Sequence, residues 1–277
     1  MKFMDTWVLY LACLISTLLI NSLLTGVIGI FARMISQILI IVLVLLSAKR
    51  TGQKFSSVFP MASYTLKQSI GTATVLGGTI MLCVPCILLF HVIAPNFAVT
   101  GYHIVDLAPN AARYLWVFLL VLLTAVANTA LFDGYMFGGF KYIENKGARS
   151  ALISLLYAVL FADVYVFAPL CIIEMGVFYV REQTKSLKLP FIMQLFASAC
   201  VYAVLQLGAK ESSFLGNNEG ASKIIGMAMI FLGVSALLLW WSSSLFGKKS
   251  ALTPFGKLMT VVIFIIFLAI GSGLVSL

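Results

Sequence analysis

Long runs of apolar residues constrain this chain more than any other feature. Apolar residues make up 62% of the chain and charged residues 10%, whereas an average soluble domain carries about 25% charge. A bilayer span needs roughly 20 mostly apolar residues. We therefore predict an all-α, polytopic integral membrane bundle of about 8–9 transmembrane helices. The predicted spans are 7–30, 34–48, 69–94, 114–140, 150–168, 169–180, 189–208, 224–246 and 258–277.

The ends of these runs add three expectations. The fifth and sixth spans are predicted to meet at Pro169, because proline disrupts a helix interior. The sixth span is short and is expected to be tilted or re-entrant. The first span has no small-residue cleavage site and is typical of an uncleaved signal anchor. No soluble domain and no internal repeat is evident, which argues against a transporter built from inverted halves.

The net charge of +9 follows the positive-inside pattern rather than a nucleic-acid patch. With the N-terminus in the cytoplasm, only Arg33, Arg113, Lys210 and Lys223 lie outside. The predicted inner basic residues are Lys2, Lys49, Arg50, Lys54, Lys67, Lys141, Lys146, Arg149, Arg181, Lys185, Lys188, Lys248, Lys249 and Lys257. This pattern predicts a cytoplasmic N-terminus, an outer C-terminus if nine spans are present, and contact with anionic lipid headgroups.

The cysteines and histidines offer little reactive chemistry. Cys83 and Cys86 form a C-x-x-C that is either a redox pair or two small apolar residues beside a proline kink, and we favour the second interpretation. The two histidines, His91 and His103, are expected to be interface or capping residues. Neither is placed to complete a metal site with residues further along the chain.

Three acids lie within the predicted spans: Asp133, Asp163 and Glu174. Ionised acids are costly in hydrocarbon, so we expect these side chains to face the bundle interior, water or a cation. Two interpretations stay open for this polar cavity. It is a remnant of an enzyme-like ancestor, or a pocket that holds a peptide, a lipid group or an ion.

The residues from 127 to 208 carry a recognisable order of motifs. The fourth span ends ANTALFDGYMFGGF, the basic loop KYIENKGAR follows, and the fifth span reads SALISLLYAVLFADVY. The sixth span leaves through CIIEMGVFYVREQTKSLKLP and the seventh begins FIMQLFASA. This order resembles the family of CAAX proteases and bacteriocin-processing enzymes (CPBP, or Abi). Its members show Glu-Glu-x-x-x-Arg with a following Gly, then Phe-x-x-x-His, and a final His-x-x-x-Asn or Asp.

The resemblance places the catalytic positions of that family on unreactive residues of this chain. Asp133, a shortened acid, and Gly134 stand for the two Glu, and Gly138 stands for the Arg. Tyr165 and Gln194 stand for the two His. The remaining positions are Phe137 and Gly139, which are kept, Phe161, which begins the Phe-x-x-x-His match, and Ser198, which stands for the final Asn or Asp.

The best match is the turn region rather than the catalytic motifs. The matching residues are Gly176, Tyr179, Arg181, Thr184, Ser186, Leu187 and Pro190. The resemblance covers roughly 114–208 and implies three parts: N-terminal transmembrane helices over 1–113, a CPBP-like core over 114–208, and C-terminal transmembrane helices over 209–277.

These substitutions remove the groups that hydrolysis needs. A general base must titrate near the reacting water, and a catalytic metal needs about three protein ligands. Tyr165 and Gln194 supply neither, so we expect no metal and no cofactor. Gly134 and Gly138 instead form a G-x-x-x-G face with Gly139 beside it, which lets another helix approach closely. Such a face packs either within the chain or against a partner.

The resemblance also makes a geometric demand. Tyr165 lies 16 residues beyond Arg149, or roughly 24 Å along one helix. Asp133 and Gln194 lie only about 9–12 Å from Lys141 and Lys188. For these positions to meet, the fifth helix must begin well outside the bilayer or tilt strongly.

We therefore predict a non-catalytic, CPBP-like pseudo-protease in the plasma membrane of a bacterium. The resemblance implies a scaffold or regulator of another membrane or cell-envelope protein, in a setting such as bacteriocin production or immunity. Two alternatives remain. One is an intramembrane peptidase with an unusual site built from Asp133, Asp163 and Glu174. The other is a small transporter or channel subunit that uses the same acids along a polar path.

Overall fold

The computed structural model describes residues 3–23, 29–93, 111–161, 164–210, 221–246 and 254–276, and every regular element within them is helical. The all-α prediction is confirmed. The elements are α1 (Phe3–Leu23), α2 (Gly29–Arg50), α3 (Phe55–Val58), α4 (Leu66–Ile93), α5 (Ala111–Asn128), η2 (Thr129–Met136), α6 (Phe137–Gly139), α7 (Lys146–Phe161), α8 (Val164–Thr184), α9 (Lys188–Lys210), α10 (Ala221–Leu245) and α11 (Pro254–Ser276).

Four stretches are long and apolar enough to cross a membrane: Phe31–Arg50, Leu66–Leu88, Tyr114–Gly139 and Ser222–Leu245. Three shorter apolar stretches accompany them, at Met4–Ile20, Lys188–Cys200 and Thr260–Ser276. Many large apolar side chains on these helices face outward. Long apolar helices with apolar outer faces indicate an integral membrane protein.

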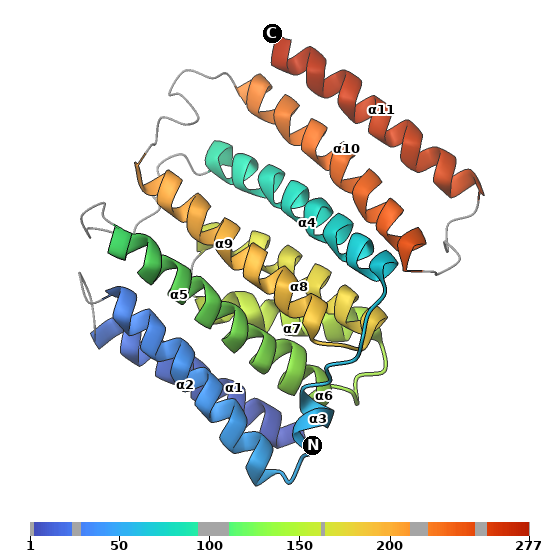
Figure 1. Cartoon of the computed structure of the whole chain (residues 1–277). Coiled ribbons are helices and arrows are strands. Elements are labelled where there is room, and N and C mark those ends of the chain that lie inside the picture. The colour runs from blue at the N-terminus through green and yellow to red at the C-terminus, as the bar shows by residue number, and fades with distance from the viewer. Residues whose placement is uncertain are drawn as a thin grey trace.

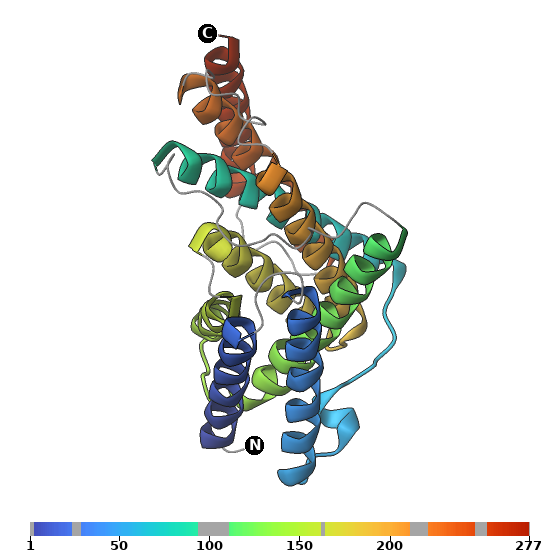
Figure 2. The same ribbon diagram turned by 90° about the vertical axis from the view of Figure 1, so that its left-hand side faces the viewer.

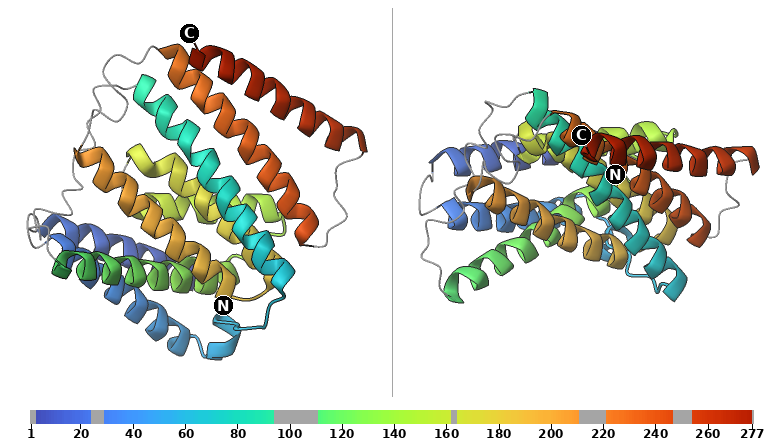
Figure 3. Two further views of the ribbon diagram at one scale, coloured as in Figure 1. Left: turned by 45° about the horizontal axis from the view of Figure 1, so that its top comes forward. Right: turned by 90° about the horizontal axis from the view of Figure 1, so that it is seen from above.

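The helices form one extended row with a second layer behind its centre (Figure 1). The row runs from α1 and α2 through α5, α9, α4 and α10 to α11, and each helix contacts the next. Helices α7 and α8 lie behind α9 and α4, as the turned view in Figure 2 also shows. Figure 3 shows α11 at the far edge of the row, where it packs on α10.

The basic residues gather at one end of this bundle. Lys49 and Arg50 close α2, Lys67 opens α4, and Lys146 and Arg149 open α7. All of these helix ends lie on the same side, and the described chain begins there and finishes at the opposite end (Figure 1). This arrangement agrees with the charge pattern from which the cytoplasmic side was predicted.

The predicted division at Pro169 is wrong. Helix α8 runs without interruption through Pro169; α7 ends at Phe161 and α8 begins at Val164. A proline is tolerated inside a membrane helix when neighbours serve the freed backbone groups. The carbonyl that Pro169 leaves without a helical donor is that of residue 165. The Cys83 thiol of α4 donates to the carbonyl oxygen of Pro169 itself at 3.5 Å, which ties α4 to this turn of α8. The predicted first span of 7–30 is also shifted, since α1 ends at Leu23 and α2 begins at Gly29.

A large apolar core surrounds the junction of α5, η2 and α6. Phe132, Tyr135, Met136 and Phe140 are each completely buried there, and they pack with side chains from α1, α2, α3, α7 and α8. The Phe132 ring meets Tyr157 of α7 edge to face, with ring centres 5.1 Å apart. This core fixes η2 at the centre of the bundle.

The α4, α10 and α11 layer packs by close backbone approach instead. A methyl group added at Gly226 of α10 would lie 2.6 Å from the carbonyl oxygen of Gly271 in α11. One added at Gly78 of α4 would lie 2.8 Å from Leu239 of α10. Small residues at such contacts allow helices to approach closely in lipid.

Candidate functional site

Asp133 lies on a π-helical segment in the middle of the chain's fourth long apolar run. The segment η2 spans eight residues, Thr129–Met136, and follows directly from α5. Seven of these eight residues are buried. Short π-helical stretches inside α-helices occur frequently at functional sites, because the wider turn changes the direction in which side chains point. η2 contacts α2, α5, α7, α8 and α9, so Asp133 lies where several helices meet.

Glu174 of α8 and Gln194 of α9 join Asp133 at this meeting point. Both side chains are 0% exposed. The Gln194 amide Nε2 donates to Glu174 Oε2 at 2.7 Å, and Gln194 also lies within hydrogen-bonding reach of the Asp133 carboxyl. The two carboxyl groups interact electrostatically with each other. Three of the residues singled out in the sequence are therefore in one buried place.

Two further residues, which the sequence did not single out, complete the network. The Tyr157 hydroxyl of α7 donates to Gln194 Oε1 at 3.4 Å, and the Asn128 amide at the end of α5 donates to the Tyr157 hydroxyl at 3.3 Å. Ser198 lies one turn beyond Gln194 on α9 and is buried. We name these six residues the polar cluster: Asn128, Asp133, Tyr157, Glu174, Gln194 and Ser198.

The place predicted for the Tyr165 side chain stays a prediction, but the helix that was to carry it is different. Helix α7 ends at Phe161, and Tyr165 is the second residue of α8, so the fifth helix does not extend to it. The residue of α7 that reaches Gln194 is Tyr157, eight residues beyond Arg149. The predicted 24 Å separation along one helix therefore does not arise. Asp163 and the side chain of Tyr165 lie outside the described residues.

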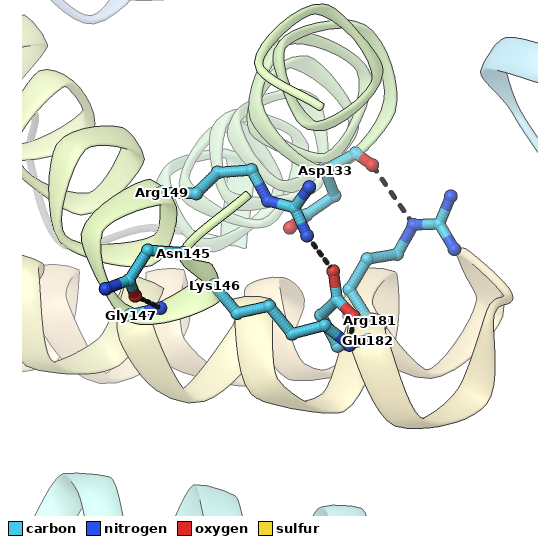
Figure 4. Close-up of polar contacts among 7 residues, drawn as sticks. All are labelled: Asp133, Asn145, Lys146, Gly147, Arg149, Arg181 and Glu182. Atoms are coloured by element: carbon cyan, nitrogen blue, oxygen red, sulfur yellow. Dashed lines mark hydrogen bonds and ion pairs between the residues drawn. The ribbon is translucent and has the colours of Figure 1, made fainter. Parts of the chain in front are cut away.

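Arginine side chains approach the cluster from its basic end. The Nε of Arg181 donates to the backbone oxygen of Asp133 at 3.1 Å (Figure 4), and its charge interacts with the Asp133 carboxyl. The Arg181 guanidinium lies 4.6 Å from the centre of the Phe137 ring. In the sequence, Arg181 follows Glu174 by seven residues on one helix, but the structure pairs it with Asp133 instead.

A second ion-pair group lies beside it. Glu182 of α8 pairs with Arg149 and with Lys146, both from the first turn of α7 (Figure 4). Arg149 is buried and lies 5.2 Å from the Phe137 ring centre and 5.4 Å from that of Phe178. The motif order puts an arginine at position 138, where this chain has Gly138. Two arginines from neighbouring helices lie around Phe137 instead.

The three glycines of the predicted packing face differ in their surroundings. A methyl group at Gly134 would lie 3.0 Å from the Phe59 ring, next to α3, and 3.3 Å from the Val58 carbonyl oxygen. This glycine is therefore covered by the chain itself. Gly139 is also buried. A methyl group at Gly138 would have no atom within 4 Å, so Gly138 is the open part of this face.

Comparisons with known proteins add no further resemblance. A scan against known protein families, a search of curated proteins and a search of solved structures each found no match. The chemistry must therefore be read from the residues themselves. In the described part of the chain, no group of three or more His, Cys, Asp and Glu side chains is arranged to hold a metal ion. The polar cluster offers two carboxyl groups, amides and hydroxyls.

Proposed function

We propose that this chain is a catalytically inactive, CPBP-like pseudo-protease that spans the membrane about eight or nine times and binds another membrane protein as a scaffold or regulator. The resemblance that supports it rests on the motif order over 114–208. In keeping with that resemblance, we place the protein in a bacterial plasma membrane with its N-terminus in the cytoplasm. Bacteriocin production or immunity is the setting that the resemblance implies.

The observation that supports the proposal most is that the Gln194 amide is hydrogen-bonded through both its nitrogen and its oxygen. This residue stands where the resemblance places a histidine, and it donates to Glu174 while accepting from Tyr157. An amide is no general base, and a buried amide that is hydrogen-bonded at both ends holds the helices on either side of it in place. The position that would activate water in a protease is here a structural bridge between α7, α8 and α9.

The partner surface that we propose is the open glycine, Gly138. It lies at the basic end of the bundle, beside Phe137, and its missing side chain leaves room for another helix. In lipid, helices associate through such small residues because backbones can approach closely. Gly134 is not part of this surface, since Phe59 covers it.

Affinity purification in a mild detergent with mass spectrometry tests the proposal. The wild-type chain is compared with Gly138→Leu and with Gly273→Leu. Gly273 of α11 also has no atom within 4 Å of an added methyl group, so it is a matched control at a distant site. We expect a co-purifying membrane protein that is lost in Gly138→Leu and kept in Gly273→Leu. No such protein, or equal recovery in both variants, would contradict the proposal.

One observation favours a peptidase as the second candidate. Asp133 and Glu174 are two buried carboxyl groups in electrostatic contact, and paired carboxylates that share a proton cleave peptides in aspartic proteases. A cleavage product that disappears in both Asp133→Asn and Glu174→Gln, but persists in Ser242→Ala on α10, would establish this function instead.

A further inference from the structure

Four oxygens in or next to the polar cluster have no hydrogen-bond partner within the described residues. They are Asp133 Oδ2, Glu174 Oε1, Ser198 Oγ and Thr129 Oγ1. All four side chains are at most 6% exposed. Buried polar atoms without partners are rare in proteins and often mark the place of a water or an ion. Here they come from three different elements, η2, α8 and α9, that meet at Gln194.

The charges around these oxygens are unequal. Arg181 acts on Asp133, whereas the electrostatic neighbours of Glu174 are Asp133 and Gln194, an acid and an amide. The buried Arg149 neutralises Glu182 nearby, and the second partner of Glu182, Lys146, lies at the surface with its side chain 70% exposed. Two carboxylates and one guanidinium leave one negative charge to be neutralised in the bundle interior, where an unpaired charge is costly. One monovalent cation would neutralise this charge, whereas a divalent cation would leave one positive charge in excess.

The backbone around Asp133 departs from the regular α-helix without breaking it. The π-helical segment η2 interrupts the regular α-helical pattern between α5 and α6. Secondary transporters bind sodium where membrane helices are interrupted and where side-chain and backbone oxygens are free to coordinate it. A change of helical form, a buried acid and unpartnered hydroxyls coincide here.

We propose that the polar cluster binds one monovalent cation between Asp133 and Glu174, with the hydroxyls of Ser198 and Thr129 as further oxygen ligands. A proton shared by the two acids would neutralise the charge but would leave both hydroxyls without partners. The inference does not rest on the scaffold function, because it concerns the interior of the bundle and not the surface at Gly138.

Sodium binding by the full chain in lipid nanodiscs tests the proposal. Radioactive sodium binding is measured directly, and the thermal unfolding midpoint is recorded in sodium chloride and in choline chloride at equal ionic strength. We expect one bound sodium per chain and a higher, saturable midpoint in sodium, because a ligand that binds only the folded state stabilises it. Glu174→Gln keeps the shape of the side chain but removes its charge, and it should abolish both effects.

Two serine variants make the test specific. Ser198→Ala removes one proposed ligand and should raise the half-saturating sodium concentration about tenfold. Ser242→Ala is the control, since Ser242 is also buried but already donates to the Leu239 carbonyl oxygen of its own helix. That variant should bind sodium like the wild type.

Three results would overturn the proposal. The first is equal midpoints in sodium and choline with no sodium bound to the wild type. The second is sodium binding that Glu174→Gln retains, which would place the ion elsewhere. The third is a midpoint that responds to pH but not to sodium, which would assign a shared proton to the acids. None of these results would affect partner capture at Gly138, so the two proposals fail separately.

Discussion

The two sides of α4 are held together by different kinds of contact. On one side, α8 and α9 carry Glu174 and Gln194, which form a buried hydrogen-bonded pair with a donor–acceptor distance of 2.7 Å. On the other side, α10 and α11 approach each other so closely that any side chain at Gly226 would meet the Gly271 backbone. No charged residue interrupts the sequence of α10 between Lys223 and Leu245.

The contrast distinguishes contacts that only hold helices together from polar contacts that helix association does not need. Close glycine contacts and apolar side chains suffice to hold membrane helices together, and the α4, α10 and α11 layer uses both, with Leu88 of α4 packed against Ile224 and Ala228 of α10. A buried network of acids and amides is not needed for adhesion, and each of its members is costly without its partner. The polar network in the η2, α7, α8 and α9 region therefore goes beyond what helix adhesion requires.

The largest effect should come from Gln194→Leu. This change keeps the approximate size of the side chain but leaves the buried Glu174 carboxyl without its donor, which should cost about 3 kcal/mol. The apparent free energy of unfolding, from denaturation by sodium dodecyl sulfate, measures it. Met193→Leu is a volume-conserving control at the preceding buried position, expected to cost less than about 1.5 kcal/mol. Equal losses in both variants would show that the polar contacts of Gln194 do not stabilise the fold more than apolar packing at the neighbouring position does.

On the glycine side, Gly226→Ala should lower the same free energy by about 2 kcal/mol, because an added methyl group forces α10 and α11 apart. Gly273→Ala on α11 is the matched control, since a methyl group there has open space around it. Its effect should be near zero or slightly favourable, as alanine favours helix more than glycine does. A large loss at Gly273 would show that helix propensity, not close packing, dominates this layer.

A smaller loss is expected for Arg149→Leu. The substitution removes the buried partner of Glu182 and the contacts with Phe137 and Phe178, and we expect about 1.5 kcal/mol. A loss above about 4 kcal/mol in the free energy of unfolding would show that this ion pair stabilises the fold more than the Gln194 hydrogen bonds do.

The smallest effect is expected for Lys146→Ala. Lys146 pairs with the same acid at 2.9 Å, but its side chain is 70% exposed. Exposed ion pairs contribute little, so the loss should stay within about 0.5 kcal/mol and should vanish in high salt. If Lys146→Ala and Arg149→Leu were equally destabilising, burial would not explain the different contributions of the two partners of Glu182.

The sequence predicted the helices better than their junctions. The apolar runs predicted the all-α membrane fold, since most of them approach or exceed the length that a bilayer requires. The division at Pro169 was wrong because sequence rules penalise proline by its local effect, whereas neighbouring helices accommodate it. The acids stood out because charged residues are rare within apolar runs, whereas Gln194 was singled out by the motif order. The structure places Asp133, Glu174 and Gln194 close together.

Other parts of the site depend on long-range packing that no local pattern records. Tyr157 lies in an apolar run without any feature that distinguishes it from the other aromatic residues there. Its role follows only from how α7 is rotated toward α9. The same holds for Gly134, whose neighbour Phe59 is distant in sequence and belongs to the connection between α2 and α4. Spacing predicted a glycine face, but only the fold shows which part of that face is open.

A double-mutant cycle on Glu174 and Gln194 tests most directly whether these residues form one buried unit. The free energy of unfolding is measured for the wild type, Glu174→Leu, Gln194→Leu and the double variant in a choline buffer without sodium. We predict a coupling energy of about 1.5 kcal/mol. The double variant should be much less destabilised than the sum of the single changes, because removing both partners leaves no buried polar group without a hydrogen bond. Losses that add within about 0.5 kcal/mol would show that the two side chains do not depend on each other, and the polar cluster would then not exist as described.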